Sequence, residues 1–502
     1  MNHISLLETN VRKHPNKDCI RANGKGYTYR DIKEMSQNAA GIFQKRGIKK
    51  GDRISIMSQN TVSFVAAFFG TLMAGGVVVP VNHKLVAPEV DYILENSGSK
   101  LFLFDCSLSG VVEKVTSGAQ KMAMDSPAPI GEFFDDLIIK GAPFSPVDIN
   151  DSDMAQILYT SGTTGKPKGC MITHQSIILN GLYSSLVIKL DEDDRMLIAM
   201  PIWHSSPINN WFAGTQVVGG TVVLMREYHP LHFLQTVQDE KCTVYFGAPI
   251  SYIMPLQLPN FDSFNLSSMR IWIYGGGPIS VDTAKMIMAK YKSEQFIQVY
   301  GMTETGPTGM SLHPKDQLRK PGSIGRTGNS GVDIKVMKSP TEQAAPGETG
   351  EIWLRSDCMM TGYYNDPKAT AEVFADGGWY KSGDMARIDE DGYLYMVDRS
   401  KDMIVTGGEN VYSKEVEDAI SACAGVVEVA VIAIPHPTWG ETVAAIVVGA
   451  KDAGLGEEQI RTFLSDKLAK YKVPRIFHFV ESLPHTPSGK VMKYKLRETY
   501  GR

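Results

Sequence analysis

Short apolar runs alternate with helical patterns along most of this chain, and this alternation limits its fold more than any other feature. The apolar or β-branched runs include residues 53–57, 77–81, 100–104, 154–160, 220–225, 243–246, 269–274 and 296–299. Helical stretches such as Leu231–Lys241 and Ser280–Tyr291 separate several of them. Strands that alternate with helices in this way form parallel sheets covered by helices. The sequence therefore predicts an α/β fold for most of its 502 residues.

One uncharged stretch, Phe64–Val81, is 18 residues long and raises the question of a membrane span. A glycine pair interrupts it, and the residues after that pair are β-branched or proline, which do not continue a helix. We therefore expect no transmembrane segment. The segment is predicted to be a buried strand–helix–strand unit, with strands at Arg53–Met57 and Val77–Val81 around a helix at about Thr61–Met73.

Composition excludes several classes of protein. Hydrophobic residues make up 43% of the chain and charged residues 21%, which is enough to bury a large core and excludes wholesale disorder. Lys and Arg number 51 against 55 Asp and Glu, a net charge of −4, so a dedicated nucleic-acid binder is not expected. The six cysteines are scattered without a C-x-x-C pair, and the first 18 residues are charged rather than signal-like. A cytoplasmic protein is predicted.

The pattern of predicted strands and helices changes at two points. From Val332 onward, short strands joined by Gly and Pro turns replace the strand–helix alternation. The polar tetrapeptide Asp398–Lys401 then follows a strand and is the best candidate for a domain boundary. About 100 residues remain beyond it, and we expect them to form a small α/β domain of their own. Its expected elements are helices at Ser413–Ala422 and Glu457–Lys470 and strands at Val427–Ile434 and Thr442–Val448.

The strongest local signal is Tyr159–Gly169, with the sequence YTSGTTGKPKG directly after an apolar strand. Its glycines let backbone N–H groups approach a polyphosphate, its hydroxyls donate to phosphate oxygens, and its lysines neutralise charge. It is not a P-loop, because Gly162 and Gly165 are too close and Pro167 follows Lys166. A flexible linker is the alternative, but linkers rarely place two lysines around a proline immediately after a buried strand.

Three further segments are weaker signals when each is taken alone. Tyr300–Gly306 follows a strand and offers a ring that stacks on a base, a hydroxyl, and an isolated carboxylate suited to Mg²⁺. Trp379–Asp384 places an acid at a turn, where it suits ribose hydroxyls or caps a loop. Pro484–Lys490 places a lysine after a Gly turn, where a solvated side chain is the default.

Together these segments resemble, in order and spacing, the adenylate-forming superfamily of acyl-CoA synthetases, peptide-synthetase adenylation domains and luciferases, and most of all an acyl-CoA synthetase. The resemblance covers nearly the whole chain. Other stretches that are similar to the family are Tyr27–Asp31, Pro201–His204, Gly275–Pro278, Gly362–Pro367 and Gly407–Asn410. The resemblance implies a large N-terminal domain of two α/β sheet subdomains plus a β-barrel (residues 1–398), a hinge (399–402) and a small mobile C-terminal α+β domain (403–502).

The resemblance also implies a reaction, that of an AMP-forming acid–CoA ligase. A carboxylate attacks the α-phosphate of ATP in the presence of Mg²⁺, which gives an acyl-adenylate and diphosphate. A thiol, usually that of coenzyme A, then displaces AMP. The expected partners are therefore a small-molecule carboxylic acid, ATP and CoA, with no nucleic acid. The oligomeric state does not follow from the sequence.

Site residues are carried over onto matching positions only. The residues expected to wrap the β- and γ-phosphates are Thr160, Ser161, Gly162, Thr163, Thr164, Gly165 and Lys168. Those expected at the adenine are Gly275, Gly276, Gly277 and Tyr300, and those at the ribose are Asp384 and Arg399. Those expected at the reacting groups are Thr303 on the α-phosphate, Glu304 on Mg²⁺, His204 beside the carboxyl and the thiol channel, and Lys490 between the carboxylate and the α-phosphate, with Lys401 at the hinge.

The pocket-forming stretches indicate the class of acid. Relatives that activate amino acids place an aspartate near the position of His204, but Met200–Met225 contains no acidic residue, and a buried ammonium would lack a partner. Trp203–Gly214 and Phe246–Met254 are apolar and small-polar. An apolar or mildly polar acid is predicted, such as a fatty or aromatic acid. The aromatic residues Trp203, Trp211 and Phe212 fit this pocket or an ordinary core equally well.

The thiol acceptor is open between two sources. Residues 467–502 hold nine basic and two acidic residues, an excess that suits CoA phosphates or a solvated terminal helix. No carrier domain follows the small domain in this sequence, which favours free CoA. An enzyme that loads a separate acyl carrier protein is the alternative. An inactive relative is disfavoured by the presence of Lys168, Glu304, Asp384 and Lys490, and a luciferase-like oxygenation is a less common outcome in this family.

Overall fold

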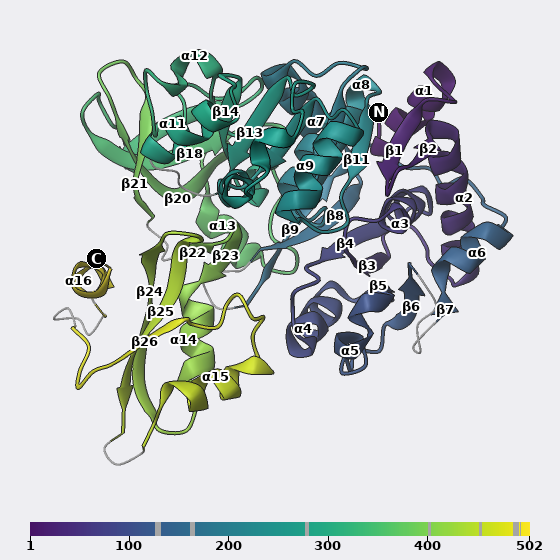
Figure 1. The fold of residues 1–502 in the computed structure, drawn as a ribbon. Helices are drawn as coiled ribbons and strands as arrows, with labels where there is room; N and C mark the ends of the chain where they lie inside the picture. Colours follow the sequence, from purple (N-terminus) through teal and green to yellow (C-terminus); the bar gives the residue numbers. More distant parts are fainter. Residues whose placement is uncertain are drawn as a thin grey trace.

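The computed structural model describes residues 1–125, 132–160, 166–276, 281–399, 403–450, 454–484, 491 and 493–501. These residues form a mixed α/β fold in which two large sheets, an antiparallel sheet and a smaller C-terminal sheet are packed together (Figure 1). The expected fold class, a large N-terminal domain with a smaller C-terminal one, is confirmed. Among the described residues, no helix combines the length and the apolarity needed to cross a bilayer.

The first large sheet has eight strands in the order β15-β14-β13-β12-β10-β11-β1-β2. Its central strands are parallel, and the two edge strands, β2 and β15, pair antiparallel. Their bounds are β1 Asp18–Ala22, β2 Lys25–Thr28, β10 Arg195–Ile198, β11 Thr221–Leu224, β12 Val244–Gly247, β13 Ile271–Gly275, β14 Phe296–Tyr300 and β15 Met310–Leu312. The carboxyl ends of the parallel strands share one edge, which is where ligands bind in sheets of this kind.

The second large sheet has seven strands in the order β7-β6-β5-β3-β4-β8-β9, and all of its pairs except β8–β9 are parallel. The bounds are β3 Arg53–Met57, β4 Val77–Val81, β5 Ser99–Asp105, β6 Gln120–Met124, β7 Glu132–Phe133, β8 Met154–Thr160 and β9 Lys168–Thr173. The bounds of β3, β4 and β8 are those predicted from sequence, because each is a mostly apolar run that is bounded by polar residues or a turn.

Helices fill the space between the two large sheets and cover their outer faces. Helices α2 (Tyr29–Lys45), α3 (Val62–Met73), α7 (His174–Ile188) and α8 (Ala213–Val218) share one apolar core with both sheets. Helix α3 is buried on nearly every side, which explains why its sequence is as apolar as a membrane span. The remaining helices of these layers are α1 His3–Lys13, α4 Ala87–Ser97, α5 Ser109–Val112, α6 Phe134–Lys140, α9 Pro230–Asp239, α10 Ile250–Ile253 and α11 Val281–Lys290, with 3₁₀ turns at Cys106–Leu108, Met254–Gln257 and Phe261–Ser263.

The third sheet is antiparallel, in the order β17-β16-β18-β20-β19 with β21 on β20. It occupies the region in which the sequence predicts short strands and a β-barrel. Isolated bridges from Gly325 to Leu394 and from Gly328 to Met310 tie it to the first large sheet. The bounds are β16 Asp333–Ser339, β17 Glu342–Gln343, β18 Thr349–Arg355, β19 Phe374–Ala375, β20 Trp379–Ile388 and β21 Leu394–Arg399, with helices α12 Pro314–Gln317 and α13 Pro367–Val373.

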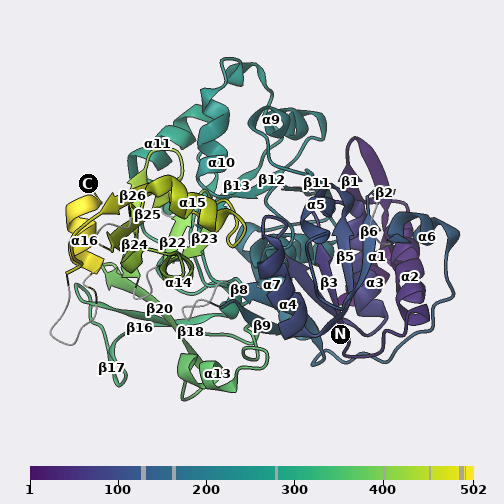
Figure 2. The ribbon, with the colours of Figure 1, turned by 90° about the horizontal axis from the view of Figure 1, so that it is seen from below.

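The C-terminal sheet runs β23-β22-β25-β24 with β26 on β25, and helices cover both of its faces. The bounds are β22 Met403–Thr406, β23 Glu409–Tyr412, α14 Ser413–Ser421, β24 Val426–His436, β25 Gly440–Gly449, α15 Glu457–Ser465, β26 Ile476–Phe479 and α16 Lys493–Tyr500. Viewed from below, these elements lie beside the antiparallel sheet and opposite the N-terminal strands (Figure 2).

Helix α15 is shorter than its sequence pattern predicts. The expected helix continued to Lys470, but α15 ends at Ser465 and successive turns follow, closed by bonds such as Lys472 N to Ala469 O at 2.8 Å. These turns bury Ala469 against the outer core of the seven-stranded sheet. Beyond Ser465, Leu468 packs in the core of the small domain and Ala469 against the large one, so the apolar residues there serve these contacts and not a longer helix.

Candidate functional site

The Tyr159–Gly169 segment is a hairpin between the last two strands of the seven-stranded sheet. Strand β8 ends at Thr160, β9 begins at Lys168, and these two residues are direct antiparallel partners. The strand before the motif is confirmed, whereas the strand after it was not anticipated. Residues 161–165, to which the sequence assigns the phosphates, lie outside the described residues. The Lys168 ammonium nitrogen lies 5.1 Å from the centre of the Tyr363 ring, at the base of the hairpin.

Glu304 lies in the turn that follows β14 and faces the same hairpin. Residues Thr303–Thr305 form a 3₁₀ turn. One oxygen of Glu304, Oε1, accepts hydrogen bonds from Tyr363 Oη at 3.1 Å and from Thr160 Oγ1 at 3.4 Å. Burial, together with the charge of Glu304, raises the pKa of Tyr363 above its usual value, so this phenol stays a donor. The carboxylate is thus held by two hydroxyl groups from distant segments.

Asp384 lies in a strand, which corrects the prediction that it lies in a turn. It belongs to β20, and the turn-like Ser-Gly-Asp sequence is a bulge in that strand, with Gly383 at φ +73°. Tyr300 at the end of β14 donates its hydroxyl to Asp384 Oδ2 at 2.8 Å. Arg399, at the end of β21, is the cross-strand partner of Asp384. The Arg399 side chain lies outside the described part, but the strand pairing places its backbone beside Asp384, the other residue predicted at the ribose.

The glycines after β13 run beside the same tyrosine. Strand β13 ends at Gly275, where a Cβ atom would come within 2.7 Å of the Val299 carbonyl oxygen, so only glycine fits against β14. Gly276 has φ +75°, in the left-handed region, and a Cβ there would meet only open space. Gly277 lies outside the described residues. An exposed glycine backbone beside Tyr300 provides a flat surface of the kind that an adenine ring occupies.

His204 lies at the start of the segment that leads into η2, a π-helix at Ser206–Phe212. Its ring lies against that of Trp203, with the ring centres 3.9 Å apart and the planes tilted by 31°, and Trp203 Nε1 donates to His83 Nδ1 at 2.9 Å. Burial is the main cause that lowers the pKa of His83 to about 4, so it is a neutral acceptor at pH 7. The next residue, Ser205, shares a 2.9 Å hydrogen bond with Thr303. His204 and the predicted α-phosphate residue therefore lie at one place.

Glu409 reaches this place from the C-terminal domain, and sequence reasoning gave it no role. Its Oε2 lies 3.4 Å from His204 Nε2, and its Oε1 lies 2.6 Å from the Lys84 ammonium nitrogen. Burial raises the pKa of Glu409, but His204 and Lys84 outweigh burial and bring it to about 2. Only the similarity of Gly407–Asn410 to the family marked this stretch beforehand. Lys84 carried no signal in the sequence.

Whether the site fits Mg²⁺ depends on the donor atoms that its side chains offer. Within the described ranges, no group of three His, Cys, Asp or Glu residues is arranged to hold a metal ion. Glu304 offers one carboxylate beside hydroxyl groups. Mg²⁺ in nucleotide sites is commonly held by one or two carboxylates, water and substrate phosphates, so this donor set fits the ion.

Two of the remaining expectations concern aromatic and basic residues. Trp211 and Phe212 are buried in the shared core, whereas Trp203 lies against His204, so the predicted aromatic group is divided between core and site.

The basic C-terminal stretch is partly neutralised within the fold. Lys472 pairs with Glu89 and Glu415, and Lys493 pairs with Glu417. Lys401 and Lys490 lie outside the described residues.

Comparison with known proteins places the chain among characterised families. Residues 7–364 match the AMP-binding enzyme family, and residues 415–490 match the AMP-binding enzyme C-terminal domain. A feruloyl-CoA synthase from Amycolatopsis sp is 34% identical, over 98% of this chain and 97% of that protein. A long-chain-fatty-acid–CoA ligase from Mycobacterium tuberculosis is 34% identical, over 94% and 93%. A fatty acid–[acyl-carrier-protein] ligase from Streptomyces coeruleorubidus is 32% identical, over 99% and 96%.

One solved relative appears in two states. It is the o-succinylbenzoate CoA synthetase of Bacillus subtilis, which is 27% identical, with 99% of this chain and 98% of that chain covered. A double mutant bound to a product analogue, OSB-NCoA, gives a TM-score of 0.89. The complex with the acyl-adenylate intermediate OSB-AMP gives 0.73. The present structure is therefore more similar to the first complex than to the second.

Proposed function

The chain belongs to the AMP-binding enzymes and is acyl-CoA synthetase-like, and on that premise we propose that it is an ATP-dependent acid–CoA ligase. In the first step a carboxylate oxygen bonds to the α-phosphorus of ATP and diphosphate leaves, which gives an acyl-adenylate. In the second step the CoA sulfur bonds to the acyl carbon and AMP leaves. The first step is needed because a carboxylate oxygen is a poor leaving group and AMP is a good one.

The convergence of Tyr300, Thr303 and Glu304 with Asp384 and Thr160 is the observation that carries this proposal. The end of β14 and the turn after it supply an aromatic ring, a hydroxyl and a carboxylate, and two distant strands supply Asp384 and Thr160, which face them. The ring and Gly275–Gly276 suit adenine, Asp384 suits ribose hydroxyls, and Thr303 suits the α-phosphate. Mg²⁺ held by Glu304 and the phosphates would neutralise charge on the phosphate oxygens.

The proposed roles of the remaining residues rest on the resemblance. Lys168 and the loop 161–165 are assigned to the β- and γ-phosphates, and the position of Lys168 beside Thr160 supports this. Lys490 is assigned to the carboxylate and the α-phosphate. Residues 399–402 are assigned to a hinge, with Lys401 in it, and β21 ends at the first of these residues. The domain limits at 398 and 403 are part of the same proposal.

We assign the present arrangement of the domains to the second step. The higher similarity to the relative bound to a CoA product analogue supports this assignment. So does Glu409, which stands beside His204 where the thiol would arrive. The approach of the Glu409 carboxylate would orient the His204 ring toward the reacting carbon.

A route for CoA leads to the same point from the surface. Trp439 is 37% exposed, and the Arg475 guanidinium carbon lies 4.7 Å from its ring centre, a combination that suits a nucleotide base and phosphates. The Trp439 ring packs on Gly407, and the next residue, Gly408, lies against Ala248. A pantetheine arm that passes Gly407 and Gly408 would reach His204.

The test is AMP release from ATP by a panel of aliphatic and aromatic carboxylic acids, with and without CoA. The proposal predicts that AMP accumulates only when acid and CoA are both present, with one thioester formed for each AMP. A Glu304→Gln variant is the matched control, because it keeps the shape of the site and removes the charge. AMP release that is independent of CoA for every acid would contradict the ligase proposal.

Loading of an acyl carrier protein is the alternative, and the relative from Streptomyces coeruleorubidus favours it. The two readings share the first step and differ in the thiol. The same assay with a phosphopantetheinylated carrier protein in place of CoA separates them. If free CoA is the acceptor, the Trp439→Ala variant should have a higher KM for CoA. Its rate of acyl-adenylate formation should be unchanged.

A further inference from the structure

The backbone that leads to His204 is fixed before the histidine is reached. This segment leaves the carboxyl end of β10 and passes Asn60, which follows β3 of the other large sheet. Asn60 Nδ2 donates to Met200 O at 2.9 Å, and Asn60 Oδ1 accepts from Ile202 N at 2.7 Å. Asn60 is itself buried. The backbone is thus held on both sides of residue 201, and the orientation of the two side chains that follow remains to be set.

The first of these side chains, Trp203, is held by a residue of the seven-stranded sheet. His83 follows the end of β4 by two residues, and its Nδ1 accepts the indole hydrogen of Trp203 at 2.9 Å. The two rings meet nearly edge to face, with their planes at 80°. Because the indole is the donor, the imidazole keeps a lone pair on Nδ1 and carries its proton on Nε2. Burial is the main cause that lowers the pKa of His83 to about 4, which maintains this neutral form at pH 7.

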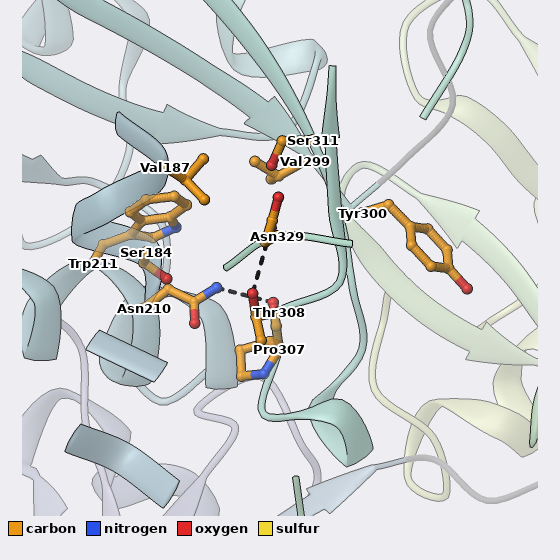
Figure 3. Close-up of a pocket in the computed structure, with 10 residues that line it drawn as sticks. All are labelled: Ser184, Val187, Asn210, Trp211, Val299, Tyr300, Pro307, Thr308, Ser311 and Asn329. Carbon is orange, nitrogen blue, oxygen red and sulfur yellow. Dashed lines mark hydrogen bonds between the residues drawn. The ribbon is translucent and has the colours of Figure 1, made fainter. Parts of the chain in front are cut away.

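Trp211, later in the same segment, has its acceptor close by. Its Nε1 donates to Ser206 Oγ at 3.1 Å. Its ring lines a small cavity together with Val187 and belongs to the core that the two large sheets share (Figure 3). The Trp203 indole, in contrast, takes its acceptor from the end of a strand in the other large sheet. A change in that acceptor therefore reaches Trp203 and leaves this part of the core in place.

The Trp203 ring is the surface against which His204 lies. The ring centres are 3.9 Å apart, and the planes are tilted by 31°. His204 Nε2 makes no hydrogen bond within the described part of the chain, although Glu409 Oε2 lies 3.4 Å away. No hydrogen bond at Nε2 therefore fixes the imidazole plane here, and packing against the indole sets it instead. A rotation of the indole would carry the imidazole with it.

The turn that contains His83 also meets the small domain. The ammonium nitrogen of the next residue, Lys84, lies 2.6 Å from Glu409 Oε1. Asn82 Oδ1 accepts from Lys84 N at 2.8 Å, which closes the three residues into a tight turn. One turn therefore holds Glu409 on one side and Trp203 on the other. Both of these side chains lie beside the same site histidine.

We propose that His83 is a positioning residue for thioester formation, and that it acts by fixing the Trp203 indole on which His204 lies. This inference rests on the proposed function, because it takes His204 to lie at the thiol channel. Attack by the CoA sulfur requires the imidazole to be directed at the reacting carbon while Glu409 is in place. The loss of His83 should therefore lower the maximal rate of the second step. The KM for CoA should change little, because the proposed contacts of the CoA nucleotide are elsewhere, at Trp439.

The first arm of the experiment removes the acceptor and then restores it in the full-length enzyme. Thioester formation from added acyl-adenylate and CoA reports the second step, and diphosphate release reports the first. His83→Leu should lower kcat of the second step by about 10- to 100-fold, with little change in the KM for CoA or in diphosphate release. His83→Asn should recover most of this loss, because its Oδ1 can accept the same indole hydrogen. Equal loss in both steps, or no recovery in the Asn variant, would overturn the proposal.

The second arm tests whether His83 acts through the indole. Trp203→Phe keeps a ring beside His204 and removes the N–H, so adding His83→Leu to it should have no further effect. Losses that multiply would place the action of His83 elsewhere and refute the assignment. Tyr29→Phe is the control for stability, because this buried hydroxyl donates to Gly220 O at 2.6 Å, away from the site. It should lower the melting temperature and keep the ratio of the two rates. A ratio that falls as it does in His83→Leu would also refute the assignment.

Failure of the proposed function gives a different result. If no acid yields a thioester with the unaltered enzyme, the ligase proposal fails, and the bond is measured without activity. The indole N–H signal of Trp203 is followed by NMR in the full chain with isotope-labelled tryptophan, and is identified by its loss in Trp203→Phe. A signal that shifts in His83→Leu and returns in His83→Asn would support His83 as the residue that positions Trp203. A signal that is unchanged in His83→Leu would reject it.

Discussion

A buried cluster of charges joins the two domains, and its removal should separate the two half-reactions. The Lys472 ammonium nitrogen lies 2.6 Å from Glu89 Oε1 on α4 and 2.8 Å from Glu415 Oε1 on α14. Burial lowers the pKa of Lys472, but the two carboxylates outweigh it, so the lysine stays charged. Burial raises the pKa of Glu415. Glu89 belongs to the large domain, whereas Lys472 and Glu415 belong to the small one, so a domain rotation breaks one pair and keeps the other.

The size of the effect follows from the burial of the lysine, which is 3% exposed. Removing one partner of a buried pair costs about 3–5 kcal/mol, because the other charges stay behind unpaired. The same pair exposed to water contributes about 0–1 kcal/mol. Lys472→Met should therefore disfavour the present arrangement by about 2–5 kcal/mol relative to a rotated one. That difference corresponds to roughly 30- to 5,000-fold in the population of this arrangement.

The assay measures the two steps separately in the full-length enzyme. Diphosphate release reports acyl-adenylate formation, and thioester formation from added acyl-adenylate and CoA reports the second step. Lys472→Met should slow the second step by up to the factor above and leave the first unchanged or faster. Lys493→Met is the control, because Lys493 pairs with Glu417 inside the small domain, 2.6 Å away. If both steps fall equally while the melting temperature is retained, the cluster does not select the domain arrangement and the reasoning is wrong.

Four further predictions concern the site, the hinge and the fold. Glu304→Gln should impair adenylation over a range of Mg²⁺ concentrations, since the ion loses a charged ligand; normal acyl-adenylate formation would remove its metal role. Lys490→Ala should lower adenylation by roughly 10²–10³ and spare the second step, with Lys493→Ala nearly normal in adenylation; loss of both steps alike would refute this role. Lys401→Pro should slow the second step more than the first, because proline fixes φ; equal loss would indicate local unfolding. His3 is buried, and burial lowers its pKa to about 3, below the unfolded value of 6.5. The unfolded chain therefore takes up this proton first, and stability is lost as the pH falls from 6.5 toward 3. His3→Leu should remove about 2 kcal/mol of that loss between pH 6.5 and 5, as measured by urea unfolding; an unchanged acid slope would exclude His3 as its source.

The strands of the sheets were predictable where burial requires a mostly apolar sequence. Strands β3, β4 and β8 are largely buried and mostly apolar, and the ends of these runs coincide with the strand ends in the structure. The antiparallel strand β9 was not predicted, because Lys168–Thr173 is half-buried and its first residue was interpreted as part of a loop. Asp384 was placed in a turn for a similar reason. A Ser-Gly-Asp sequence favours turns locally, and only the pairing of β20 with its neighbours shows that it is a bulge.

Only those parts of the candidate site that lie within a single sequence segment were predictable. Tyr300, Thr303 and Glu304 are neighbours in sequence, so their common location needs no tertiary information. The partners of these residues, Ser205 and Tyr363, come from segments about 60 to 100 residues away and are ordinary in composition. A hydroxyl that binds another hydroxyl leaves no periodicity and no charge pattern to recognise.

Glu409 and Lys472 show why the rest depends on the domain arrangement and not on local sequence. Each forms an ion pair with the opposite domain, Glu409 with Lys84 and Lys472 with Glu89. In the sequence each is one charged residue among many, and a solvated side chain is the natural interpretation. Both pairs join the two domains, so a rotation of one domain against the other would break both. Glu409 therefore lies beside His204 only while the ion pairs between the domains are formed. A substitution at Lys84 should lower the population of the present domain arrangement, as a substitution at Lys472 should.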